Sequence, residues 1–390
     1  MSINFVGKDC CGCRTCKTEC KFNAISVVTD KYGFEQMAVD PKRCTECGLC
    51  EKVCPALHSE KSSERYSCGA AYAIDSDTKF QGSSGGLFGV FAKRIILDGG
   101  CVYGAAFDKD LKLKTTSAET LDELAPLYKS KYLLCNTNDK FIEIKSKLDS
   151  GKKVLYCSSP CQIAALKLYL KKSYKNLLTV EFICHGVGSQ TLFDRSIAYS
   201  EKKLSAKIKQ VVFRHKIKNA SSHYYLYKCE RATKAFDKQD LYLSFPYYNA
   251  YCKQLVCRDA CYDCKYATEE RCADITIGDF HTIEKYDPSI DRFAGVSMFV
   301  CNSLTGEEFF NSVKEDLFVK PFEWSILKEN NRFHSDGRRP QSQQEFMESV
   351  AAQPFEKTVK KHLRPSKDWI RLLYYKSPSF LRNIARKFWR

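Results

Sequence analysis

The residues with the clearest chemical potential in this sequence are two runs of cysteine near its start. The first run has the spacing C-x2-C-x2-C-x3-C and the second repeats it; the members are Cys10, Cys13, Cys16 and Cys20, then Cys44, Cys47, Cys50 and Cys54. Three closely spaced thiolates can bind three irons of a cubane, while the fourth cysteine of each run lies on the following helix and reaches the other cluster. The spacing therefore predicts two [4Fe-4S] clusters, with Cys54 completing the first and Cys20 completing the second.

Zinc is the alternative for a segment so rich in cysteine. Zinc sites usually pair two C-x2-C units and do not present four cysteines in this rhythm, so the spacing favours iron. From its first residue to Pro55 the sequence resembles a bacterial two-cluster ferredoxin, including a predicted hairpin, ISVVTDKYGFEQMAV, between the motifs. Cys11 is an additional thiol in the first run, and the spacing assigns it no role.

Composition places these motifs in a large chain. With 390 residues the protein can bury a core without disulfides. The chain has 22 cysteines, and its start, MSINFVGKDCCG, lacks the charged and apolar stretches of an export signal, so we expect reduced thiols in the cytoplasm. No uncharged apolar run is long enough to span a membrane. The net charge of +16 suits an acidic partner or a solvated surface, and without an RNA- or DNA-binding motif we do not expect nucleic acid as a partner.

The strands and helices after Pro55 must position any further reactive or cofactor-binding residues. A polar linker, ALHSEKSSERYS, precedes apolar strands that alternate with helical stretches, which is typical of a mixed α/β domain. A strand is expected from Ala70, and a Gly/Ser loop from Gly82 opens an amphipathic helix that ends before Gly99. Bare amides at such a helix start suit a phosphate or a flavin edge, and a flexible turn before a core helix is the alternative.

A second set of cysteines lies at the ends of predicted strands. Cys161 follows a strand from Val154, Cys184 and His185 follow a strand from Leu177, and a loop with Cys261 and Cys264 precedes the strand ADITIGDF. Strand ends can converge at one edge of a sheet, so these thiols could meet there. The spacing C-x3-C-x2-C of Cys257, Cys261 and Cys264 also occurs in radical-SAM enzymes, but too little chain follows for the barrel that they use. We therefore keep that class as a less favoured alternative.

Several stretches together resemble the coenzyme F420 hydrogenase/dehydrogenase beta-subunit family, in its bacterial branch with an N-terminal ferredoxin domain. They are SSGGLFGVFAKRIILDGGCVYGAAFD, SKYLLCNTND, VLYCSSPCQIAALK, EFICHGVGS and RDACYDCKYATEERCADITIGDF. The resemblance implies an FAD-binding α/β domain with its own [4Fe-4S] cluster, held by Cys161, Cys184, Cys261 and Cys264. It also implies that FAD lies against Ser84, Gly85 and Gly86 and near Ser130, Lys131 and Tyr132. His185 and His281 are candidate proton donors.

These observations predict an iron–sulfur flavoprotein oxidoreductase. The expected fold has a two-cluster ferredoxin domain over residues 1–58, a mixed-sheet α/β flavin domain over 59–340, and a basic helical extension over 341–390. Electrons would pass between the clusters and FAD to reduce or oxidise a small molecule or an F420-like hydride carrier, with ferredoxin or a reduced deazaflavin as donor. The alternative is a noncatalytic electron-transfer subunit of a larger redox complex.

The last residues of the sequence bear on where in the cell the protein is located. SPSFLRNIARKFWR, from Ser377, predicts a helix with apolar residues on one face and basic residues on the other. Such a helix suits an anionic membrane surface, at the inner face of the membrane, and equally suits docking on its own protein.

Overall fold

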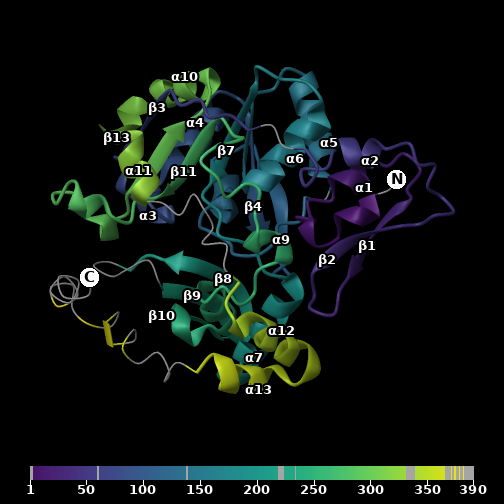
Figure 1. Cartoon of the computed structure of the whole chain (residues 1–390). Helices are drawn as coiled ribbons and strands as arrows, with labels where there is room; N and C mark the ends of the chain where they lie inside the picture. Colours follow the sequence, from purple (N-terminus) through teal and green to yellow (C-terminus); the bar gives the residue numbers. More distant parts are fainter. Residues whose placement is uncertain are drawn as a thin grey trace.

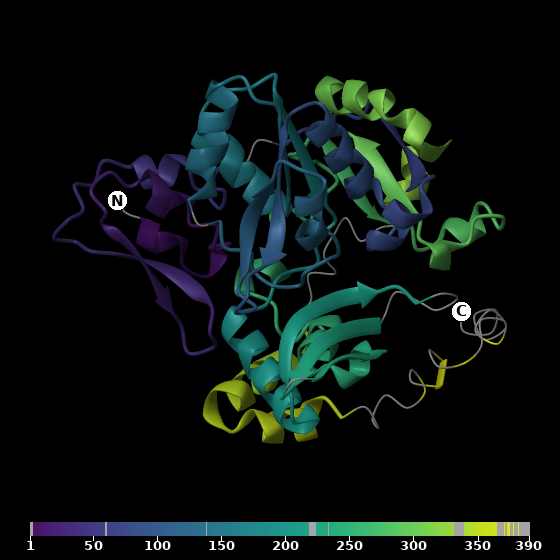
Figure 2. The ribbon, with the colours of Figure 1, turned by 180° about the vertical axis from the view of Figure 1, so that it is seen from behind.

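The protein is described from a computed structural model, which covers residues 3–58, 61–137, 139–217, 224–232, 234–330 and 339–364 and isolated positions after residue 364. Figures 1 and 2 show three parts: a small N-terminal module, a large sheet with helices on both faces, and a smaller sheet with its own helices. The N-terminal module lies beside the helices α5 and α6 of the large sheet. The three parts meet where the cysteine-bearing loops lie.

The N-terminal module consists of two similar halves around a hairpin. Its elements are the 3₁₀ segment η1 (Ile3–Asp9), helix α1 (Thr15–Glu19), strands β1 (Ile25–Thr29) and β2 (Glu35–Val39), and helix α2 (Leu49–Lys52). Each short helix carries the third cysteine of its run and follows a residue in the left-handed conformation, Arg14 (φ 63°) or Gly48 (φ 69°). The core of the module includes Cys16 and Cys54, so the predicted cluster ligands take the place of a larger apolar core.

The large sheet is mixed and has the strand order β13-β3-β12-β11-β7-β6-β4-β5. The neighbours β4, β6, β7 and β11 run parallel, and the other pairs are antiparallel. Its strands are β3 (Ser67–Ala73), β4 (Cys101–Phe107), β5 (Leu113–Ala118), β6 (Val154–Ser158), β7 (Leu177–Phe182), β11 (Ile275–Asp279), β12 (Ser297–Cys301) and β13 (Leu317–Pro321). The carboxyl ends of the parallel strands therefore share one edge.

Both faces of this sheet are buried. Side chains alternate along each strand, so that in β6 Leu155 packs with helix α4, whereas Val154 and Tyr156 pack with α5 and α6. Helices α3 (Ser76–Gln81), α4 (Leu87–Leu97), α5 (Lys140–Asp149), α6 (Pro160–Leu170), α10 (Leu304–Ser312) and α11 (Trp324–Asn330) accompany the sheet. Short 3₁₀ segments link them: η2 (Asp122–Leu127), η4 (Ile283–Lys285), η5 (Arg292–Ala294) and η6 (Lys314–Asp316).

A separate small sheet has the order β10-β9-β8 and its own core. It contains β8 (Lys207–His215), β9 (Tyr224–Arg231) and β10 (Lys234–Leu241), with helices α7 (Gln190–Leu204), α8 (Pro246–Cys252), α9 (Asp259–Tyr262), α12 (Ser342–Ala352) and α13 (Phe355–His362) and segment η3 (Tyr242–Ser244) nearby. Phe346, Met347 and Val350 of α12 are buried in this core. Helices α12 and α13 thus complete this core, and the basic helical extension predicted over 341–390 stays a prediction.

The strands and helices that carry the motifs lie where the sequence predicted them. These are the β1–β2 hairpin, strand β3, the loop into α4, strand β6 leading into α6 at Pro160, and strands β7 and β11. In the part of the chain that the structure describes, no helix has the length and apolar content needed to cross a bilayer. The predicted basic helix from Ser377 lies outside the described residues, apart from Ser377 and Leu381, so membrane association stays a prediction.

Candidate iron–sulfur and flavin site

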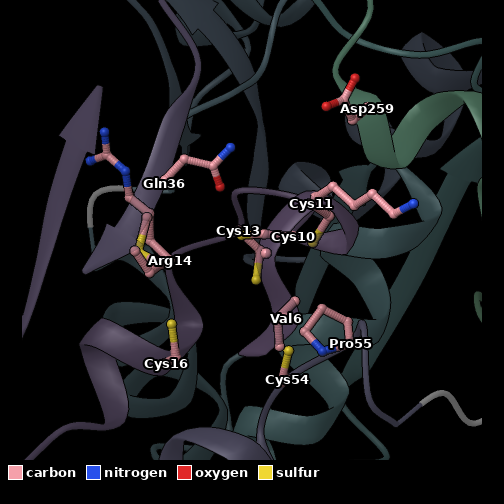
Figure 3. Close-up of a pocket in the computed structure, with 13 residues that line it drawn as sticks. Val6, Cys10, Cys11, Cys13, Arg14, Cys16, Gln36, Cys54, Pro55 and Asp259 are labelled. Atoms are coloured by element: carbon pink, nitrogen blue, oxygen red, sulfur yellow. The ribbon is translucent and has the colours of Figure 1, made fainter. Parts of the chain in front are cut away.

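The predicted ligands of the first cluster surround one cavity. A space of about 410 Å³ is lined by Cys10, Cys13, Cys16 and Cys54, with Cys11 and Arg14 at its border. Figure 3 shows the sulfur atoms of Cys13, Cys16 and Cys54 directed toward the same space. Four thiols around one cavity form the donor set that a cubane requires, so these residues suit the cluster that the spacing predicts.

The predicted ligands of the second cluster lie nearer the surface. Cys47 is exposed, whereas Cys20, Cys44 and Cys50 are partly buried. Cys20 and Cys50 pack against the same core as Cys16 and Cys54, which places the second set beside the first. A cluster held here would therefore be the one most open to an external redox partner.

The structure brings the second set of cysteines together at the edge of the large sheet. Cys161 begins α6 directly after β6, Cys184 follows β7, and Cys261 lies in α9. Burial raises the pKa of the Cys184 thiol, and negative charge on Cys161 and Cys264 would raise it further. Burial also raises the pKa of the Cys261 thiol, and negative charge on Cys184 and Cys264 would raise it further. Mutual repulsion between thiolates is the effect that bound iron would relieve.

Cys11 lies between the first set of thiols and this third set. The Cys11 thiol is in hydrogen-bonding contact with Cys13 and Cys161, and this contact is the main cause that raises the pKa of Cys11 and lowers the pKa values of Cys13 and Cys161. Cys11, Cys13, Cys161 and Cys264 pack in one apolar core. The additional thiol that had no role from spacing therefore marks the contact between the two sites.

The two predicted flavin segments also lie together. Ser83 accepts a hydrogen bond from the Ser130 amide at 2.7 Å, and their hydroxyl oxygens are 3.0 Å apart. Ser84 donates to the carbonyl of Val296 at 2.7 Å, next to the start of β12. The loop before α4 and the stretch Ser130–Tyr132 therefore form one surface near the carboxyl ends of the parallel strands.

The glycines of this loop have a packing explanation. A Cβ atom on Gly85 would lie 2.5 Å from the Ala71 carbonyl oxygen and 2.8 Å from the Ser297 nitrogen, both backbone atoms. Gly86 has φ 88° and would place a Cβ 2.9 Å from the Thr78 carbonyl oxygen. The loop thus needs glycine to approach β3, β12 and α3, and contact with FAD at Gly85 and Gly86 stays a prediction.

Basic side chains crowd the same loop. Lys129 donates to the carbonyls of Phe80 and Gly82, and Lys216 donates to those of Lys79 and Ser84. Burial, and to a smaller extent neighbouring cations, lower the pKa of Lys216 to about 7 and that of Lys129 to about 8. An anionic group would relieve this repulsion, so the surroundings of the loop suit the phosphates of a dinucleotide cofactor.

Aromatic rings connect this surface to the third set of thiols. The Tyr132 ring stacks on Tyr251, with ring centroids 4.3 Å apart. Burial raises the pKa of Tyr251 well above its usual value, and charge on Cys184 and Cys257 would raise it further. Tyr251 thus lies between the predicted flavin residue Tyr132 and the predicted cluster ligand Cys184.

The candidate proton donors lie in different settings. His281 is exposed, and its Nε2 is 3.9 Å from Asp279, which forms an ion pair with Arg214. Ser84 is close enough to Asp279 to contribute to lowering the pKa of its carboxyl, so His281 is close to the predicted flavin loop. His185 is partly buried and directly follows Cys184, and its carbonyl accepts a 3.7 Å hydrogen bond from Cys257. His281 is therefore better placed to exchange protons with solvent.

Lys131 is partly buried near this surface, and its side chain folds back onto the preceding turn. Its Nζ donates to the carbonyls of Pro126 and Tyr128, and burial lowers its pKa to about 7. Sequence reasoning missed Arg214, Lys216 and Tyr251, which complete the surroundings of the loop. These residues come from β8, the position directly after it, and α8, and no motif marks them as neighbours of Ser84 or Cys184.

The alternatives to this arrangement are less well supported. Cys257 is buried and donates to the carbonyl of His185. The large sheet is open and mixed, and so differs from the barrel that the radical-SAM alternative needs.

A two-cluster ferredoxin module joined to a mixed α/β domain with cysteines at its sheet edge defines an iron–sulfur protein of the electron-transfer class. Residues 151–323 match the family model for the C-terminal part of the coenzyme F420 hydrogenase/dehydrogenase beta subunit. Residues 9–57 match a 4Fe-4S dicluster domain. Residues 151–323 therefore belong to the coenzyme F420 hydrogenase/dehydrogenase beta-subunit family, and an N-terminal 4Fe-4S dicluster domain precedes them.

Individual relatives match in two different ways. A ferredoxin-like protein in the nif region of Sinorhizobium fredii is 38% identical over 61 residues, covering 14% of this chain and 88% of the relative. Its counterpart in Rhizobium leguminosarum is 36% identical with the same coverage. The F420-reducing [NiFe] hydrogenase complex from Methanosarcina barkeri contains a structurally similar chain, with a TM-score of 0.45 and 16% identity over 76% of this chain and 92% of that chain.

Proposed function

We propose that this protein is an iron–sulfur flavoprotein oxidoreductase that passes electrons between [4Fe-4S] clusters and FAD, and so reduces or oxidises a small molecule or an F420-like hydride carrier. The observation that supports this proposal is that the first and third sets of thiols lie in contact with each other. The first set reaches Cys13, Cys11 joins Cys13 to Cys161, and Cys161 belongs to the third set. The stacked rings of Tyr251 and Tyr132 lie between Cys184 and the surface formed by Ser83 and Ser130.

Bound against that surface, FAD would supply the exchange between a hydride and single electrons. Lys129 and Lys216 would bind its anionic part, because both cations are held close together by loop carbonyls. His281 would exchange a proton with solvent, since its side chain is exposed and lies 3.9 Å from Asp279. Tyr132 would present its ring beside the path to the third cluster.

Electrons would enter or leave at the second cluster. Cys47 is exposed, and the other predicted ligands of that cluster are only partly buried. An external donor such as ferredoxin could therefore approach this cluster directly, whereas three predicted ligands of the first cluster, Cys13, Cys16 and Cys54, are buried. The same geometry serves an enzyme or, as the words beta subunit in the family description suggest, an electron-transfer subunit of a larger complex.

The decisive experiment is anaerobic purification followed by iron, zinc and flavin quantitation. Three cubanes and one flavin predict about twelve irons per chain and about one FAD. A preparation that contains zinc or no metal and releases no flavin would overturn the proposal. Turnover of a deazaflavin or small-molecule acceptor by the isolated chain with reduced ferredoxin would favour the enzyme, whereas activity only with a partner protein would favour the subunit.

A further inference from the structure

Arg258 is a buried cation at the contact between the first and third sets of thiols. Its side chain is 2% exposed, yet Arg258 lies in the segment that carries Cys257 and Cys261. Its amide donates to the Val187 carbonyl at 3.0 Å, and its carbonyl accepts from the Cys261 amide at 2.9 Å. The backbone of Arg258 is therefore fixed within the loops that hold the third set.

The guanidinium of Arg258 reaches into the first set. It donates two hydrogen bonds to the carbonyl oxygen of Glu35 in β2, one of them 2.8 Å long. A Cβ atom on Gly12, between Cys11 and Cys13, would lie 3.2 Å from its Nη2. One side chain thus spans from the third site to the cysteine loop of the first.

Within the described part of the chain, this cation lacks an anionic partner. Its Nε has no hydrogen-bond partner there, and the nearby carboxylates are engaged elsewhere. Glu35 pairs with Arg14 through two hydrogen bonds, and Asp259 pairs with Arg339. An unpaired buried charge costs several kcal/mol, so a counter-charge is expected close by. The thiolates of the first cluster would provide it.

We propose that Arg258 is a positioning residue for electron transfer: its charge raises the reduction potential of the first cluster, and its hydrogen bonds hold that cluster against the third. This inference rests on the proposed function, because it requires bound clusters. Net charge and burial are among the factors that set the potential of an iron–sulfur cluster, and a cation favours the more negative, reduced form. Arginine keeps its charge at every accessible pH.

The test compares Arg258→Gln with Arg258→Lys by EPR-monitored redox titration of the anaerobic protein. Both side chains can donate to the Glu35 carbonyl, but only lysine keeps the charge. We expect a negative shift of the first cluster's midpoint potential in the glutamine variant and a value near the native one in the lysine variant. The first cluster's signal is assigned by its loss in a Cys16→Ser variant. A weaker magnetic interaction between the reduced first and third clusters should accompany the shift.

Arg14→Gln is the matched control, because Arg14 lines the same cavity but is neutralised by Glu35. It should shift the midpoint less than Arg258→Gln. Equal midpoints in the glutamine and lysine variants, with full iron content, would overturn the proposal for Arg258 and leave the proposed function intact. Failure of both Arg258 variants to load iron, while Arg14→Gln loads fully, would also overturn it, because Arg258 would then serve assembly. Absence of iron from the native protein would instead refute the proposed function.

Discussion

The buried ion pair between Glu181 and Arg271 offers a sharp test of how the third site is held. Glu181 lies in β7, three positions before Cys184, and Arg271 lies between Cys264 and β11. The two side chains are 0% and 3% exposed. Glu181 also accepts hydrogen bonds from Thr276 at 2.9 Å and from Cys272 at 3.1 Å. The pair therefore fastens the loop that carries Cys264 to the strand that leads to Cys184.

Glu181→Gln keeps the shape of this side chain but leaves the charge of Arg271 buried without its partner. Removing one partner of a buried pair costs about 3–5 kcal/mol. For a unit of roughly 200 residues this corresponds to a decrease in melting temperature of about 6–20 °C. Because the pair lies beside the third set of thiols, we expect that cluster to be lost before the other two, with iron falling from about twelve to about eight per chain.

The assay is anaerobic thermal unfolding together with iron quantitation. Glu119→Gln is the control, because Glu119 pairs with Lys147 and Lys152 at the surface, and a surface pair contributes about 1 kcal/mol or less. A double variant, Glu181→Leu with Arg271→Met, should recover part of the loss, since it removes both charges. If Glu181→Gln unfolds and retains iron like Glu119→Gln, the ion pair does not hold the third site.

Three further predictions test the site. Cys161→Ser should lower iron to about eight per chain and remove one EPR signal, and retention of about twelve irons would exclude Cys161 as a ligand. Gly85→Ala should destabilise the protein by about 1–3 kcal/mol and weaken flavin retention, because its Cβ would contact backbone atoms. The control is Gly104→Ala, whose Cβ would meet Leu127 at 3.6 Å and which should change stability by less than about 0.5 kcal/mol. Equal melting temperatures of the two variants would contradict this explanation. In flavin-free protein the pKa values of Lys216 (about 7) and Lys129 (about 8) lie below those of the unfolded chain. The unfolded chain then binds more protons above pH 7, so stability should fall as the pH decreases from about 10 to about 7. Melting temperatures against pH should show this slope, and a Lys216→Gln variant with an unchanged slope would refute the assignment.

Much of the fold was accessible from sequence because it follows from local patterns. The hairpin between the cysteine runs, the strands from Ala70 and Leu177, and the helix at Pro160 all lie within the predicted segments. The thiols Cys101, Cys229 and Cys301, each within a strand, are 0–3% exposed. Local periodicity, however, carries no information on which strands become neighbours. The small sheet of β8, β9 and β10, and the burial of α12 in its core, were not anticipated for this reason.

By itself the sequence determined the chemistry of the first two sites, because their ligands lie within short loops whose spacing decides what they can bind. The tertiary structure decided the rest. Cys161 and Cys184 meet because β6 and β7 are parallel neighbours whose carboxyl ends share one edge. Cys11 and Arg258 acquire a role only where the N-terminal module packs against that edge. Such contacts join residues far apart in the chain, and their energy depends on burial, which spacing alone does not encode.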